Sequence, residues 1–169
     1  MDIRGDAIVV WQDGIHGNFT AVASISRPGR SWQKPARISK RPALTPHVVM
    51  DARGDATVVW EGPRGSVVAA SKTLTGHRWS PAKTLDRGGS NNPYPQMAVD
   101  PSGDAIVTWS GNPVEAAVRR GRNGRWQRAV KLGHGGVSQA AIAAHGHAIV
   151  VWQDGQAHAI VIKAASYTA

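Results

Sequence analysis

DIRGDAIVVWQDG, residues 2–14, occurs four times along the chain with small changes. The copies read DARGDATVVWEG from Asp51, DPSGDAIVTWSG from Asp100 and AHGHAIVVWQDG from Ala144. In the first three, an Asp-x-x-Gly turn precedes an apolar run that ends in tryptophan. A phrase that returns at a near-constant interval indicates repeated supersecondary units.

The tryptophans fix the length of the repeat, because all seven fall into two series. The first series, with spacings of 49, 49 and 43 residues, is Trp11, Trp60, Trp109 and Trp152. The second series, with spacings of 47 residues, is Trp32, Trp79 and Trp126. We therefore divide the single domain, residues 1–169, into repeat units at about 1–41, 42–90, 91–134 and 135–169.

Each unit is predicted to contain four short strands. The clearest copy has them at residues 46–51, 55–60, 66–74 and 79–85, with Val, Thr and Trp in the runs and Gly and Pro between them. Asp-x-x-Gly between the first two strands predicts a tight hairpin. Its aspartate oxygen bonds backbone N–H groups further on, and its glycine takes a positive φ.

The second strand of each unit is apolar on both faces. In the first unit Ala7, Val9 and Trp11 alternate with Ile8 and Val10. A strand of this kind must be covered on both faces. Four-stranded sheets that recur every 45–50 residues and are covered on both sides are blades of a β-propeller. The predicted fold is therefore an all-β propeller of antiparallel four-stranded blades.

The strand count does not complete a ring. The first unit lacks most of its first strand and the last unit lacks its fourth, so this chain carries about 3.5 blades. Three interpretations stay open at this point. The chain closes as a small irregular ring, copies of it form a homo-oligomer that completes a larger ring, or it is a fragment of a longer propeller protein.

The repeat resembles those of exported bacterial β-propeller proteins, with blades in the style of sialidases and propeller lectins. The resemblance is carried by D-x-x-G-D-A-x-V-x-W and by G-x-x-W-x-x-A-x-x-L. The sialidase-type Asp box, S-x-D-x-G-x-x-W, is degenerate here. The corresponding turns read SRPGRSW (26–32), TLTGHRW (73–79) and GRNGRW (121–126), with glycine and tryptophan but no aspartate. The resemblance implies an extracellular or cell-surface parent protein and carries over no catalytic residue.

A ligand site is predicted on the face with the loops between second and third strands. Each loop follows a first-series tryptophan with polar residues, and one loop between units adds amides and a tyrosine. An indole beside carboxylates and amides suits a sugar, whose C–H face packs on the ring. The candidate residues are Trp11, Gln12, Asp13, Trp60, Glu61, Trp109, Ser110, Asn91, Asn92, Tyr94, Trp152, Gln153 and Asp154. A tryptophan at a fixed place in every blade is, however, more often a wedge packed between neighbouring sheets than a ligand contact.

The positive charge is concentrated at the predicted outer edges of the blades. The chain has 20 Lys and Arg against 11 Asp and Glu, and sixteen of the basic residues lie in 27–41, 72–87 and 119–131. Basic residues there either bind an anionic polymer or guard edge strands against aggregation. The candidate polyanion-binding residues are Arg119, Arg120, Arg122, Arg125 and Arg128.

Other chemistry receives little support from the sequence. With no cysteine there is no disulfide or thiolate site, and no alternating run of oxygen ligands suggests a metal. No cofactor motif and no catalytic constellation is present, and no apolar stretch reaches the roughly 18 residues of a membrane span. No signal-peptide pattern precedes the first repeat. We expect a non-catalytic, lectin-like carbohydrate-binding module. The alternatives are a polyanion- or protein-binding surface on the basic outer rim, and a scaffold fragment of a longer exported propeller protein or glycosidase.

Overall fold

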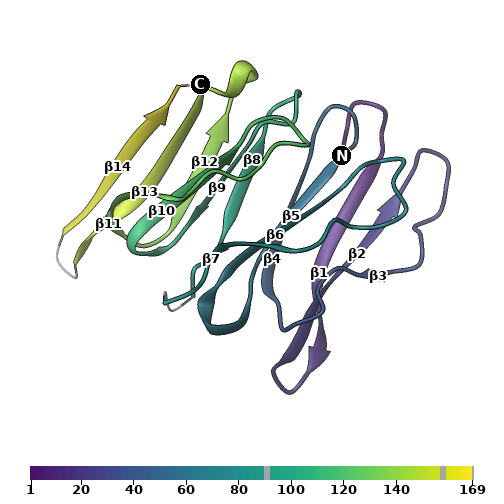
Figure 1. Cartoon of the computed structure of the whole chain (residues 1–169), viewed down its shortest axis with the longest axis horizontal. Coiled ribbons are helices and arrows are strands. Elements are labelled where there is room, and N and C mark those ends of the chain that lie inside the picture. The colour runs from purple at the N-terminus through teal and green to yellow at the C-terminus, as the bar shows by residue number, and fades with distance from the viewer. Residues whose placement is uncertain (90–91, 157–158, 169) are drawn as a thin grey trace.

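The computed structural model describes residues 1–89, 92–156 and 159–168. In these residues the chain forms four antiparallel sheets of three, four, four and three strands. The sheets stand side by side in a row, with the N-terminal sheet at one end and the C-terminal sheet at the other (Figure 1). The all-β propeller arrangement with about 3.5 blades is thus as predicted.

The fourteen strands follow the repeat. The first sheet holds β1 (Ala7–Ile15), β2 (Asn18–Ser26) and β3 (Ala36–Arg37). The second holds β4 (Leu44–Met50), β5 (Ala56–Glu61), β6 (Val67–Lys72) and β7 (Lys83–Asp86). The third holds β8 (Gln96–Val99), β9 (Ala105–Trp109), β10 (Gly111–Arg119) and β11 (Val130–Gly135). The fourth holds β12 (Ser138–Ile142), β13 (Ala148–Gln156) and β14 (Ala159–Tyr167), and two 3₁₀ turns are η1 (Pro63–Gly65) and η2 (Ala144–Gly146).

The Asp-x-x-Gly turns have the predicted geometry. Asp51 Oδ1 accepts hydrogen bonds from the backbone N–H groups of Arg53 and Asp55, both at 2.9 Å. Gly54 has a φ of 82°, a conformation that glycine adopts without a Cβ clash. Asp2 and Asp100 repeat this arrangement in the first and third sheets. In each of the first three units, the carboxylate therefore stabilises the hairpin turn that precedes the second strand.

Neighbouring sheets are joined by the first-series tryptophans. Trp60 packs against Ala21 of the preceding sheet, Trp109 against Val59, and Trp152 against Ile106. We call the face with this tryptophan the leading face of a sheet, because it contacts the sheet before it. The opposite, trailing face receives the next tryptophan. The interior strands β5 and β9 are buried along their whole length, as expected for strands covered on both sides.

The fourth strands are shorter than the sequence suggests. The second-series tryptophans precede these strands instead of starting them, since β7 begins at Lys83, four residues after Trp79. Pro81 and Pro35 lie between the tryptophan and the strand in the second and first units. Proline cannot donate to a ladder, so it interrupts the pairing. Before it, the N–H groups of Gln33 and Ser80 each donate one bond to the third strand, to Ile25 O and Ser71 O.

The row of sheets is open at both ends. The first and fourth sheets lie at opposite ends of the molecule (Figure 1), so the structure does not support a small closed ring. Within the described residues, no helix is long and apolar enough to cross a membrane.

Candidate functional site

Three first-series tryptophans of the predicted ligand site lie in the core. Trp60, Trp109 and Trp152 are buried, and Trp109 has no exposed surface at all. The indole N–H of Trp109 donates to Glu115 Oε2 at 3.2 Å, and that of Trp152 donates to the backbone oxygen of His134 at 3.1 Å. No ring face of these residues is open to a sugar. Trp11 is half-buried, because no sheet precedes its own.

The polar residues after these tryptophans do not gather into one site. The loops in the first and fourth units are shorter than expected, because β1 continues through Gln12 and Asp13 and β13 through Gln153 and Asp154. Gln12 Oε1 accepts a hydrogen bond from the Thr45 backbone N–H at 3.2 Å, so it joins two sheets.

Acidic side chains of the predicted site have separate surroundings. Asp154 forms an ion pair with Lys163 on the neighbouring strand, whereas Asp13 is exposed. Glu61 is buried, and burial raises the pKa of its carboxyl group. These carboxyl groups therefore do not form a common acidic site.

Three other predicted residues do come together. Asn92, Tyr94 and Ser110 line a cavity of about 480 Å³, the tyrosine cleft, with Asn112 and Gly135. The Tyr94 side chain is 47% exposed. Ser110 Oγ is buried and has no hydrogen-bond partner among the residues that the structure describes. Asn91, also predicted here, lies outside the described residues.

A larger cavity lies between the second and third sheets, at the opposite ends of the strands. Its volume is about 580 Å³. Five cationic side chains line it against two carboxylates, so the cavity carries an excess of positive charge. We call it the basic cleft; its charged lining residues are Lys72, Lys83, Arg119, Arg122, Arg125, Asp51 and Asp55.

Arg119 is the buried cation of the basic cleft, with only 4% of its surface exposed. Its guanidinium donates to Ser71 Oγ at 2.8 Å and to Thr57 Oγ1 at 3.2 Å, both across the sheet interface. Its third contact is the backbone oxygen of Gly103 at 3.3 Å. Within the described part of the chain its Nε has no partner. The charge is therefore held by neutral oxygens.

Burial lowers the pKa of Arg119, and the nearby carboxylates Asp51, Asp104 and Asp55 partly oppose this. Burial also lowers the pKa of Lys72, and the positive charge of Arg27 adds to the effect. Both shifts have burial of the positive charge as their main cause, and an anion bound beside either group would oppose them.

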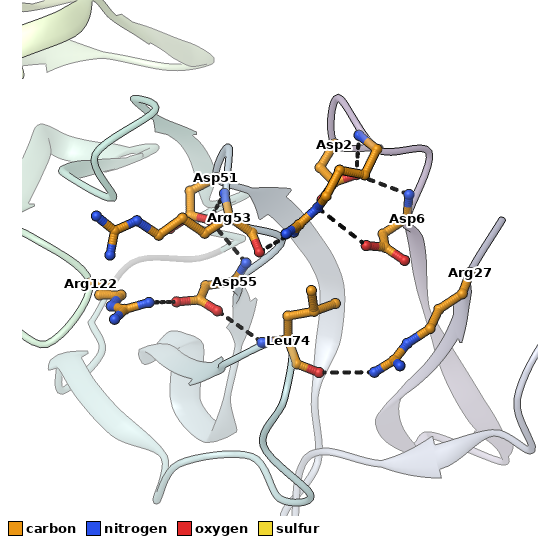
Figure 2. A network of polar contacts seen from close by, with 9 residues as sticks. Asp2, Asp6, Arg27, Asp51, Arg53, Asp55, Leu74 and Arg122 are labelled. Carbon is orange, nitrogen blue, oxygen red and sulfur yellow. Dashed lines mark hydrogen bonds and ion pairs between the residues drawn. The ribbon is translucent and has the colours of Figure 1, made fainter.

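The wall of the basic cleft is braced by a polar network. Arg122 Nη1 lies 2.8 Å from Asp55 Oδ2, and the other oxygen of Asp55 accepts from the Leu74 N–H at 2.8 Å (Figure 2). Arg27 of the first sheet reaches the Leu74 backbone oxygen at 3.4 Å. The network therefore ties the loop after β6 to both neighbouring sheets.

Exposed cations and an aromatic ring complete the basic cleft. Lys83 and Arg125 are exposed and form no ion pair with any residue that the structure describes. Trp126 also lines the cavity and is partly buried against the second sheet. The cleft thus offers exposed positive charge and an indole in its lining.

The structure separates the five arginines predicted to bind polyanions. Arg119, Arg122 and Arg125 line the basic cleft. Arg120 points toward the fourth sheet, where its guanidinium lies 5.6 Å from the Tyr167 ring centre. Arg128 is exposed and lies outside the cavity lining.

Sequence reasoning missed Lys72, Lys83 and Ser71 as members of this cleft. A usable signal was present for Lys72, which ends its third strand as Arg119 does in the following unit. For the other two, only the approach of one sheet to the next reveals the site. Among the described residues, no three His, Asp or Glu side chains form a group that could hold a metal ion.

Comparison with known proteins supports the fold alone. No family model and no curated protein matches the sequence. A protein of unknown function from Dyadobacter fermentans is similar in structure, with a TM-score of 0.65 and 12% sequence identity. The match covers 97% of this chain and 50% of that protein. The intramolecular trans-sialidase from Ruminococcus gnavus follows, with a TM-score of 0.54, 12% identity, and coverage of 97% and 40%.

A variant of the NanB sialidase from Streptococcus pneumoniae is also similar. Its TM-score is 0.51 at 10% identity, with 80% of this chain covering 24% of that one. The chain thus spans half or less of the length of each of these proteins. They show that its four sheets are arranged as in β-propeller proteins.

Proposed function

We propose that the chain is a non-catalytic binding module for acidic carbohydrate, and that the ligand binds in the basic cleft. The observation that carries this proposal is the buried cation Arg119, held by neutral oxygens beside Trp126. A sulfate or carboxylate group on the ligand balances the excess charge. The module belongs to an extracellular or cell-surface parent protein, where acidic glycans occur.

The chemistry of the lining fits a sugar better than a bare ion. Trp126 lines the cavity as an apolar side chain beside the cations, and the hydroxyl of Ser71 and the amide of Asn123 offer hydrogen bonds to sugar hydroxyl groups. Lys83 and Arg125 at the mouth are free to contact acidic substituents. The similarity in fold to two sialidases agrees with a carbohydrate ligand.

The test is binding of a heparin-derived oligosaccharide, compared with its desulfated counterpart, by calorimetry at several salt concentrations. We expect the sulfated form alone to bind, and its affinity to fall as salt rises. The double variant Lys83→Gln, Arg125→Gln should bind roughly tenfold more weakly, since two exposed charge contacts contribute on the order of 1–2 kcal/mol.

The matched control is Arg128→Gln, Lys131→Gln, which removes the same charge from exposed positions outside the cleft lining. Its affinity should stay within about twofold of the wild type, because screened charges at a distance contribute little. An equal loss in both double variants would assign binding to overall charge and overturn the cleft as the site.

A neutral sugar in the tyrosine cleft is a second candidate function. It is favoured by the buried Ser110 Oγ, which has no hydrogen-bond partner among the described residues and lines the same cavity as the half-exposed Tyr94 ring. A screen of neutral oligosaccharides should then find a ligand whose binding is unchanged by added salt and by heparin fragments. Tyr94→Ala should abolish its binding while Tyr94→Phe preserves most of it, since stacking needs the ring and not the hydroxyl.

A further inference from the structure

The two ends of the row expose faces that every interior sheet buries. On interior sheets, the leading face carries Trp60 with Trp79, or Trp109 with Trp126, and these indoles pack on the preceding sheet. The first sheet has the same pair, Trp11 and Trp32, and no other sheet of the described residues packs in front of it. Trp32 is consequently 50% exposed.

The trailing face of the fourth sheet is the complementary surface. Val151 stands one position before its tryptophan, as Val59 does in the second sheet. Val59 has no exposed surface, because Trp109 packs on it, whereas Val151 is 38% exposed. Ile149 stands three positions before Trp152, as Ile106 stands three positions before Trp109 in the third sheet. Ile106 is buried against the fourth sheet.

The exposed trailing face continues onto the last strand. Ile162 is paired with Gln153 in register and so shares the face of Ile149 and Val151. Ile160 lies two residues before it, on the same face, and both isoleucines are about 70% exposed (68% and 70%). A row of isoleucine and valine of this kind on a soluble sheet marks an interaction surface.

We propose that these two end faces bind each other in trans, so that the leading face of one copy of the chain docks on the trailing face of a second copy. Trp11 and Trp32 then occupy the place that Trp109 and Trp126 occupy on the second sheet. The contact repeats the packing of tryptophan on valine that already joins the second and third sheets within one chain. The partner is therefore identified by its surface as a blade of this repeat.

Each contact of this kind uses one leading and one trailing face. A head-to-tail contact leaves one of each free unless the assembly closes on itself. We expect closure as a pair, in which each copy contributes one face to each of two identical contacts.

The experiment is a complementation test on the purified full chain, read by sedimentation and by light scattering after gel filtration. The wild type should have twice the mass of a 17.9 kDa chain. The leading-face variant is Val9→Glu, Trp32→Glu, and the trailing-face variant is Ile149→Glu, Ile162→Glu; all four side chains are exposed. Each variant alone should be a monomer, because every contact of the closed pair contains one altered face.

Mixing the two variants should restore a 1:1 complex, since each supplies the face that the other lacks. This complex should dissociate more readily than the wild-type pair, because it has one intact contact instead of two. The matched control is Val130→Glu, an exposed apolar position on β11 away from the end faces, which should dimerise like the wild type. Circular dichroism should show unchanged strand content in every variant.

Several results would overturn the proposal. They are a monomeric wild type at all concentrations tested, dimers that survive in both end-face variants, and a mixture that remains monomeric. Aggregation that neither pair of substitutions reduces would also contradict it, since the association would then involve other surfaces.

Discussion

The guanidinium carbon of Arg119 lies 5.2 Å from the centre of the Trp126 ring, a contact within the third sheet at the wall of the basic cleft. The indole stabilises a buried cation whose hydrogen bonds are made to the hydroxyl groups of Thr57 and Ser71 instead of to water. The same contact leaves the positive field directed into the cavity between two sheets. Stability and ligand binding therefore make different demands on this arginine.

Replacing Arg119 with methionine separates these two roles. Thr57 Oγ1 and Ser71 Oγ already bond each other at 3.0 Å, and this bond remains when the guanidinium is gone. We expect the free energy of unfolding to fall by no more than about 2 kcal/mol, the magnitude of a buried cation–π contact. Arg119→Ala should cost more, because it also leaves a cavity. Urea denaturation measures both, and a larger loss for methionine than for alanine would contradict this account.

The turn aspartates predict the acid sensitivity of the fold. Burial by itself would raise the pKa of Asp100, but hydrogen bonds from Ser102, Asp104 and Gly103 outweigh it and hold the pKa below 3.8. The unfolded state then binds protons more readily, so this stabilisation is complete above the ordinary pKa and is lost as pH falls through the lowered one. Unfolding free energy should be flat near neutral pH and should drop below roughly pH 4. Asp100→Asn should lower stability at pH 7 and flatten that drop, as urea titrations at several pH values will show.

The fourth turn offers a stabilising substitution. Ala143 stands where the other units have aspartate, and its turn keeps the backbone bonds from Ala143 N–H to His147 O and from Gly146 N–H to Ala143 O. Without a carboxylate, His145 takes a φ of 67°, which is unfavourable for a residue with a Cβ. Ala143→Asp should add about 1 kcal/mol of stability through new hydrogen bonds to the turn. Thermal unfolding measures this; Ala144→Asp is the control and should gain nothing.

The two tryptophan environments predict opposite outcomes on truncation. Trp109 is fully buried, so Trp109→Ala should cost about 3–5 kcal/mol and leave little folded protein. Trp32 is half exposed, so Trp32→Ala should change the stability of a single chain by less than about 1 kcal/mol. Circular dichroism and urea denaturation distinguish the two. A folded Trp109→Ala with impaired sugar binding would restore the stacking interpretation of this residue.

The repeat made much of the fold predictable from the sequence. The Asp51 turn could be deduced because an aspartate, a glycine and two flanking apolar runs determine a hairpin locally. Burial of β5 on both faces followed from its unbroken apolar run. Both features depend on residues close together in the chain, where the pattern alone carries the information.

The candidate site depended on contacts that no local pattern encodes. Alternation places Trp60 and Val59 on opposite faces, but both faces are apolar, and only the packing of sheets determines what each one contacts. Likewise Arg119 binds Ser71 and Thr57, which lie 48 and 62 residues away in sequence. Its role in a cleft therefore could not be read from the basic segment in which it occurs.

Each sheet is attached to the sheet before it by its own indoles, and this gives the row a polarity. Removing the last sheet would uncover mainly aliphatic and hydroxyl side chains, such as Ile106 and Thr108, and would take the Tyr167 ring from Arg120. Removing the first would strip Trp60 and Trp79 of the surface on which they rest. Shortening the chain is thus far less damaging from its C-terminal end than from its N-terminal end. A gene that gains or loses whole repeats can do so with the least disturbance at that C-terminal end.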